Sequence, residues 1–106
     1  MRDKAQKLFN SYKLVKNIAE HDTLTGLDNR YAFEEALKLR VAKNTRFQES
    51  IALLLFDLDH FKYINDTHGH DTGDELLRQV AKKISKCLRE NEIFARIGGD
   101  EFAIIL

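Results

Sequence analysis

The sequence lacks the features of a secreted or membrane-embedded protein. Its 106 residues include one cysteine, Cys87, which cannot form an internal disulfide, so a disulfide-stabilised scaffold is excluded. No apolar run approaches the length that spans a bilayer, and the charged N-terminal residues 1–4 do not resemble a secretory signal peptide. We therefore expect a cytoplasmic chain without a membrane segment.

The sequence also lacks an excess of charge of one sign. Lys and Arg together number 17, as do Asp and Glu, so no net basic field draws in nucleic acid and we expect no nucleic-acid partner. What the chain does have is a 43% apolar content at single-domain length. That content is enough to build one hydrophobic core.

The most informative stretch is Gly-Gly-Asp-Glu-Phe at residues 98–102. It connects two apolar runs, residues 93–97 and 102–106, and this pattern predicts a β-hairpin with two carboxylates at its tip. The glycines permit positive φ angles and a close approach of a ligand to the backbone. Adjacent carboxylates at a tight turn repel each other unless a cation lies nearby. In isolation, however, such a segment is more often an ordinary solvated acidic turn.

Two helices are predicted ahead of the first strand. Residues 3–20 form either a helix that packs on its own domain or a linker helix that pairs with a second chain, because their apolar residues follow heptad spacing: Leu8, Tyr12, Val15 and Ala19. After a turn, Asp28 or Asn29 can cap a second helix, which would bury Phe33, Ala36, Leu37 and Val41. The polar residues 43–50 predict a loop.

An unbroken apolar run at residues 51–56 predicts a central strand covered on both faces. Asp57 closes this strand, at the carboxyl end where sites in open α/β sheets often lie. If the hairpin lies beside this strand, Asp57 and Asp100 converge, and hard carboxylate oxygens of this kind suit Mg²⁺. A further helix is predicted from a capping box of Thr72 and Glu75, with Cys87 on its buried stripe.

Three further motifs accompany the acidic turn in a fixed order. They are residues 22–30 (Asp-Thr-Leu-Thr-Gly-Leu-Asp-Asn-Arg), 56–66 (Phe-Asp-Leu-Asp-His-Phe-Lys-Tyr-Ile-Asn-Asp) and 69–74 (Gly-His-Asp-Thr-Gly-Asp). With residues 98–102, they resemble the GGDEF family, the diguanylate cyclase domains of bacterial signalling. The resemblance implies an α/β (α+β) fold, in which helices flank a sheet related to polymerase and nucleotide cyclase palms. Residues 1–21 would be an N-terminal linker helix and residues 22–106 the N-terminal portion of the domain.

The activity implied by this resemblance is the condensation of two GTP molecules into cyclic di-GMP with release of pyrophosphate. It implies a homodimer in which each subunit holds one GTP, and an upstream sensory or receiver domain joined through the helix. The family domain continues past the hairpin, whereas this sequence stops at Leu106. We therefore expect the chain as given to turn over poorly. Two alternatives remain: a catalytically silent domain that senses GTP or cyclic di-GMP, and a dimerisation fragment.

The resemblance also assigns catalytic and metal-binding roles. Mg²⁺, or Mn²⁺ in its place, would be held by Asp57, the carbonyl of Leu58, and Asp100. The catalytic group would be Asp100, Glu101 and Lys62, with Asp100 helping to deprotonate the attacking 3′-hydroxyl and Lys62 neutralising phosphate charge.

Guanine would be read by Asn65 and Asp74, since a carboxylate accepts the two adjacent donors on the pairing edge of guanine. Further contacts with the substrate are implied for Phe61, His70 and Gly99. Arg89 and Glu92 occupy a possible product-inhibition site, where many family members carry Asp in place of Glu92. Because the Glu side chain is longer, we expect product inhibition to be weak or absent.

Overall fold

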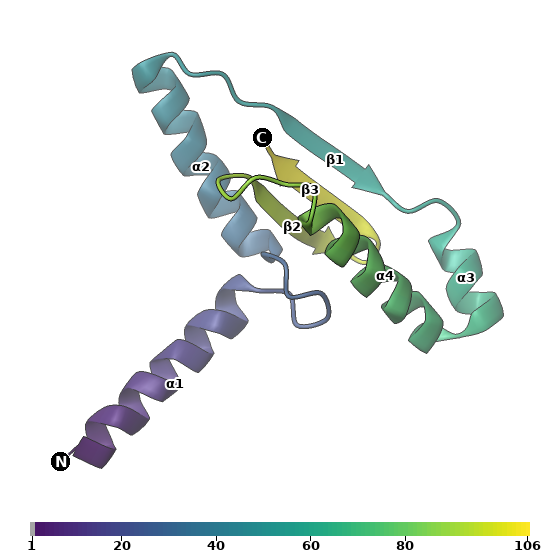
Figure 1. The fold of residues 1–106 in the computed structure, drawn as a ribbon, viewed down its shortest axis with the longest axis horizontal. Coiled ribbons are helices and arrows are strands. Elements are labelled where there is room, and N and C mark those ends of the chain that lie inside the picture. The colour runs from purple at the N-terminus through teal and green to yellow at the C-terminus, as the bar shows by residue number, and fades with distance from the viewer. Residues whose placement is uncertain (1) are drawn as a thin grey trace.

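The computed structural model describes residues 2–106 and contains seven regular elements. In chain order these are α1 (Arg2–Glu20), α2 (Arg30–Phe47), β1 (Leu53–Asp57), α3 (Phe61–His68), α4 (His70–Ser85), β2 (Ile93–Gly98) and β3 (Glu101–Ile105) (Figure 1). The predicted α/β composition is confirmed, as is the hairpin formed by β2 and β3.

The three strands form one antiparallel sheet in the order β1-β3-β2. Strand β3 is therefore in the centre, and β1 lies at an edge of the described sheet (Figure 1). The prediction of a central strand at residues 51–56 was wrong. Leu53, Leu54 and Leu55 are 46%, 48% and 65% exposed. An apolar run predicts a strand but does not say whether the strand is central or at an edge. The order of strands in a sheet depends on contacts between residues that are distant in sequence.

Successive residues of β3 point to opposite faces of the sheet and enter two separate cores. On one face, Phe102 and Ile104 pack against Leu77 of α4, and the ring of Phe102 stacks on that of Phe56 with centroids 5.4 Å apart. On the other face, Ala103 and Ile105 pack against Phe33 of α2. Helices α4 and α2 therefore cover opposite faces of the sheet.

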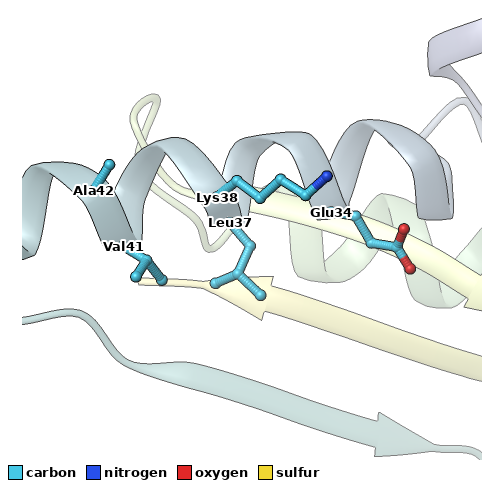
Figure 2. A pocket seen from close by; sticks show the side chains of 5 residues that line it. All are labelled: Glu34, Leu37, Lys38, Val41 and Ala42. Carbon is cyan, nitrogen blue, oxygen red and sulfur yellow. The ribbon is translucent and has the colours of Figure 1, made fainter.

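Helix α2 begins as predicted but ends later than expected. The Asn29 side chain accepts a hydrogen bond of 2.9 Å from the Ala32 amide, which makes Asn29 the N-cap. The helix then continues to Phe47 through residues expected to form a loop, since their side chains are compatible with an exposed helix. Val41 is 47% exposed and not part of the core. It lies with Leu37 along a hollow of about 490 Å³, where both side chains point toward the sheet (Figure 2).

Two local predictions for α4 were also wrong. The helix begins at His70, after Gly69 with φ of 91°, so Thr72 lies inside it and donates to the His68 carbonyl. Glu75 bonds to Gln79 and does not reach back to the helix start. Cys87 lies beyond the last turn of α4 and is exposed.

Helix α1 extends away from the sheet (Figure 1). Its heptad stripe is open, with Leu8, Tyr12 and Val15 exposed by 73%, 62% and 65%. The interpretation that this stripe of α1 packs against its own domain is therefore wrong for Leu8, Tyr12 and Val15. None of the helices in residues 2–106 is both long enough and apolar enough to cross a membrane.

Candidate active site

The acidic residues predicted to converge lie together at one end of the sheet. In the register of β1 and β3, Asp57 is opposite Glu101. One residue further on, the Leu58 amide donates a hydrogen bond of 3.3 Å to the carbonyl of Asp100. The side chains of Asp57 and Glu101 also line an open hollow of about 310 Å³ together with apolar residues of all three strands. This end of the sheet therefore presents oxygen ligands beside a space open to solvent.

This donor set fits Mg²⁺ better than a metal that needs a closed protein cage. Within the described part of the chain, no three His, Cys, Asp or Glu side chains are grouped as metal ligands. Mg²⁺ keeps several waters and is commonly bound through one or two carboxylates and substrate phosphates. At this end of the sheet, the groups that could hold such an ion are the carboxylates of Asp57 and Asp100 and the carbonyl of Leu58.

Helix α3 follows the acidic cluster after a sharp turn. His60 adopts a φ of 60°, in the left-handed region that is uncommon for residues other than glycine. The turn lets the chain leave β1 and start a helix immediately, so Phe61 and Lys62 lie in the first turn of α3. Phe61 packs against the α4 core cluster, whereas Lys62 is exposed. Lys62 is therefore able to reach a phosphate outside the protein surface.

The residues predicted to read guanine lie where α3 crosses α4. The Asn65 side-chain oxygen is buried and has no hydrogen-bond partner among the described residues. A Cβ atom placed on Gly73 would collide with that oxygen, so any larger residue at position 73 would force the Asn65 side chain to move. Asp74 follows Gly73 and is half-buried. The Asn65 side chain therefore lies against the residue that precedes Asp74 in α4, which brings the two predicted guanine-reading residues to the same helix crossing.

The remaining predicted residues are distributed around this region. His70 is exposed at the first position of α4, and Gly99 is exposed in the turn between β2 and β3. Arg89 and Glu92 lie in the turn between α4 and β2, at the opposite end of β2 from the acidic turn. Both line a separate hollow of about 330 Å³ that also includes Asp28 and Glu90. The structure therefore groups Arg89 with Glu92 but does not bring them to the acidic cluster.

Two residues with a place beside the site had no predicted role. Arg96 donates from Nε to the Gly99 carbonyl at 2.9 Å and from Nη1 to Asp22 Oδ1 at 3.0 Å. Asp22 Oδ2 accepts from the Thr25 amide and hydroxyl at 2.8 and 2.7 Å. Burial acts to raise the pKa of Asp22, but these hydrogen bonds and the Arg96 charge together outweigh it and hold the pKa below its usual range. The sequence signal was an arginine just before the paired glycines.

Comparison with known proteins identifies the family. Residues 19–106 match the family model described as "Diguanylate cyclase, GGDEF domain". Among solved structures, the coiled coil and GGDEF domain of DgcB from Caulobacter crescentus, in complex with c-di-GMP, superimposes with a TM-score of 0.94 at 37% identity. The match covers 99% of this chain and 55% of that one.

Curated relatives carry two kinds of name. Diguanylate cyclase DgcS of Shewanella oneidensis is 41% identical over 103 residues, which is 95% of this chain and 35% of DgcS. Cyclic di-GMP phosphodiesterase PdeB of the same organism is 44% identical over 106 residues, which is 100% of this chain and 12% of PdeB. The chain thus spans only part of the length of the relatives it matches. From the family match and the shared fold, the chain belongs to the GGDEF family.

Proposed function

We propose that this domain is a Mg²⁺-dependent diguanylate cyclase that joins two GTP molecules into cyclic di-GMP and releases pyrophosphate. The observation that carries this proposal is the pairing of Asp57 with Glu101 and of Leu58 with Asp100 at one end of the sheet. That arrangement offers anionic oxygens at an open end of the sheet, and the exposed Lys62 follows five residues after Asp57 along the chain. Because the substrate is an intracellular nucleotide, the reaction would take place in the cytoplasm.

The crossing of α3 and α4 supports guanine as the base. The Asn65 side-chain oxygen is a buried acceptor without a partner among the described residues, a situation that costs about 1–3 kcal/mol, and a rotation of this side chain toward the base would supply the missing donor. Asp74 can accept the two adjacent donors of guanine, whereas adenine presents a mismatched pattern. Phe61 at the start of α3, His70 at the start of α4 and Gly99 in the turn between β2 and β3 are proposed as further contacts with the nucleotide.

In this mechanism the chain's residues position the phosphates and remove one proton. Asp57, the Leu58 carbonyl and Asp100 would hold Mg²⁺, which when bound stabilises the charge on the attacking and leaving oxygens. Asp100 accepts the proton of the attacking 3′-hydroxyl, and Glu101 beside it keeps the local charge negative. Lys62 offsets the charge that develops on the phosphate.

The two substrates must meet across two copies of the domain, since each copy offers one acidic cluster. Helix α1 provides a surface for pairing, because its heptad stripe is uncovered on the described chain. A mixed dimer of one intact chain and one Asp100→Ala chain should then be nearly inactive. Activity that falls only in proportion to the intact chains would mean that each subunit works alone.

A second candidate is a domain that binds nucleotide without catalysis. It is favoured by the match over the whole chain to PdeB, a relative named for cyclic di-GMP hydrolysis. Such a domain would use the same guanine contacts to sense GTP or cyclic di-GMP. The two candidates differ in whether a new phosphodiester bond is formed.

The test is product analysis with the full-length natural protein. Incubation with GTP and Mg²⁺ should yield cyclic di-GMP and pyrophosphate, ATP should yield no cyclic product, and Asp100→Ala should abolish turnover. GTP binding that survives with no product from the unsubstituted protein would establish the sensor instead. Equal binding of ATP and GTP would contradict the guanine contacts.

A further inference from the structure

The turn that carries Asp100 has little packing to hold its shape. A Cβ atom placed on Gly98 or Gly99 would meet nothing within 4 Å, so the side-chain side of both residues is open. Between Arg96 and Gly98 the register of β2 against β3 shifts, which marks a bulge just before the turn. The position of the carboxylates must therefore depend on a small number of hydrogen bonds.

Two of those hydrogen bonds reach the turn from outside it. The Leu58 amide donates to the Asp100 carbonyl, and Arg96 Nε donates to the Gly99 carbonyl at 2.9 Å. The first comes from Leu58, the residue directly after the edge strand β1, and joins two neutral backbone groups at 3.3 Å. The second comes from a guanidinium that is only 19% exposed and has a second partner. Charge-assisted hydrogen bonds of this kind are stronger than bonds between neutral groups. The bond from Arg96 to Gly99 therefore restrains the turn more strongly than the bond from Leu58 to Asp100.

That second partner belongs to the segment that ends α1. Arg96 Nη1 donates to Asp22 Oδ1, and Asp22 is 17% exposed with its other oxygen occupied by Thr25. Asp22 follows α1 by two residues. Its backbone is fixed as well, because its amide donates to the Leu27 carbonyl at 2.7 Å and its carbonyl accepts from Gly26 at 2.8 Å.

The end of α1 is in turn tied to the start of α2. The Asn29 side chain donates to the Ala19 carbonyl at 2.8 Å, and the Asn29 amide donates to the Glu20 carbonyl at 2.9 Å. The same side chain caps α2 through the Ala32 amide. A displacement of α1 therefore moves Asp22 with it, because no free segment separates the two.

We infer that Arg96 is a positioning residue that sets the geometry of the Gly98–Gly99 turn, and that Asp22 makes this geometry depend on the seating of α1. The inference deepens the proposed function and rests on it for its effect on catalysis. In this arrangement the Arg96 guanidinium alone would transmit a displacement of α1 to the turn that carries Asp100. A lysine cannot replace it, since an ammonium lacks the planar fork that serves both acceptors at once.

The test compares Arg96→Lys and Asp22→Asn with Arg30→Lys in the full-length natural protein. Arg30 is a matched control because its Nε also donates to a single oxygen at 3.0 Å, but it lies 70% exposed on α2, away from the turn. In the protein without nucleotide, hydrogen exchange at residues 98–101 should rise about tenfold in Arg96→Lys and Asp22→Asn, and in Arg30→Lys it should not change. Exchange in α4 should stay as in the parent.

The kinetic prediction separates positioning from a general loss of structure. In both variants kcat should fall about tenfold while KM for GTP stays within about twofold, because the guanine contacts are untouched. The double variant should be no slower than the slower single variant, since both remove one connection. Unchanged exchange at the turn, or a uniform rise across the whole domain, would overturn the inference. If the parent makes no cyclic di-GMP, the proposed function fails, and the exchange comparison alone decides the positioning.

Discussion

The two strands that meet at the acidic cluster are equally apolar but differ in packing. Phe102, Ala103 and Ile105 of β3 are fully buried, whereas Leu53, Leu54 and Leu55 of β1 are about half exposed. Strand β3 has a strand on each side and a helix against each face, while β1 has one strand neighbour within residues 2–106. We call the region around β3, Leu77 and Phe33 the packed half, and β1 with the C-terminal part of α2 the open half.

This difference shows how the site is supported. Asp100 lies in the loosely packed turn that joins the buried strand β3 to β2, whereas Asp57 ends the exposed edge strand β1, so the two carboxylates are held by different parts of the fold. The hollow beside Leu37 and Val41 is lined by side chains of α2 and lies on the side of that helix that faces the sheet (Figure 2). Anything that covers the open half should therefore act on Asp57 more than on Asp100.

Alanine substitutions in β3 and β1 should give the largest difference in the free energy of unfolding between the two halves. Phe102→Ala removes a ring that is 0% exposed and stacks on Phe56, so the free energy of unfolding should fall by about 3–5 kcal/mol. Leu55→Ala removes a side chain that is 65% exposed and should cost less than about 1 kcal/mol. Urea unfolding measures both. Similar losses would mean that β1 is as buried in solution as β3.

A matched pair of glycines should give the next largest difference. Gly73→Ala places a methyl group against the Asn65 side chain, so it should lower the free energy of unfolding by about 1–3 kcal/mol and weaken GTP binding. Gly99→Ala adds a methyl group in open space and should change stability by less than about 0.5 kcal/mol. Thermal unfolding and GTP titration test this. A stable Gly73→Ala protein with full GTP affinity would remove Asn65 from the proposed guanine contacts.

Removing the Asp74 carboxylate, the proposed acceptor for the guanine donors, tests the same region without adding a bulkier side chain. Asp74→Ala should weaken GTP binding by about 1–3 kcal/mol, the cost of leaving nucleobase donors unpaired. Because Asp74 is only half-buried and belongs to no core cluster, the unfolding midpoint should stay close to that of the parent. Isothermal titration with GTP and ATP gives the measurement. A loss of ATP binding equal to that of GTP would argue against guanine recognition.

The smallest expected effect is the pH dependence of the Asp22 contact. The folded-state pKa of Asp22 lies below its unfolded value, so its stabilising contribution is complete at neutral pH and is lost as pH falls through the acid range. Asp22→Asn should therefore lose about 1–2 kcal/mol at neutral pH and much less near pH 3.

Asp28 serves as a control because its pKa is shifted in the opposite direction from that of Asp22. Burial raises its pKa, only partly opposed by His21, so its charge works against folding at neutral pH. Asp28→Asn should therefore not show a stability loss that disappears in acid. Urea unfolding at several pH values measures both variants, and the same trend in both would contradict the role given to the Arg96 contact.

What the sequence could predict was local. The hairpin and a helix cap at Asp28 or Asn29 were correctly predicted, because each depends on residues a few positions apart, and the structure selects Asn29 as the cap. The capping box at Thr72 was wrong because Gly69 lets α4 start earlier, a choice fixed by the packing of α3 on α4. The edge position of β1 was missed because its apolar residues are also typical of a central strand.

The candidate site shows the same limit. Asp57 and Asp100 were expected to converge because strand ends and hairpin tips are recognisable, and the register of β1 and β3 brings them to one end. Arg96 was missed because its partner Asp22 is 74 residues away, and nothing in the composition of either segment links them. The Asn65 contact with Gly73 likewise depends on the helix crossing.

The central claim is that the packed hairpin and the open strand supply one shared cluster, and a double-mutant cycle of kcat tests it most directly. Asp57→Asn and Asp100→Asn should each lower kcat by about 10²–10³-fold in the full-length natural protein, with the fold retained. The double variant should be slower than the single variants by no more than about threefold, because residues that act as a unit are not additive. If the two losses multiply, or if Asp57→Asn keeps nearly full turnover, the two halves do not form one site.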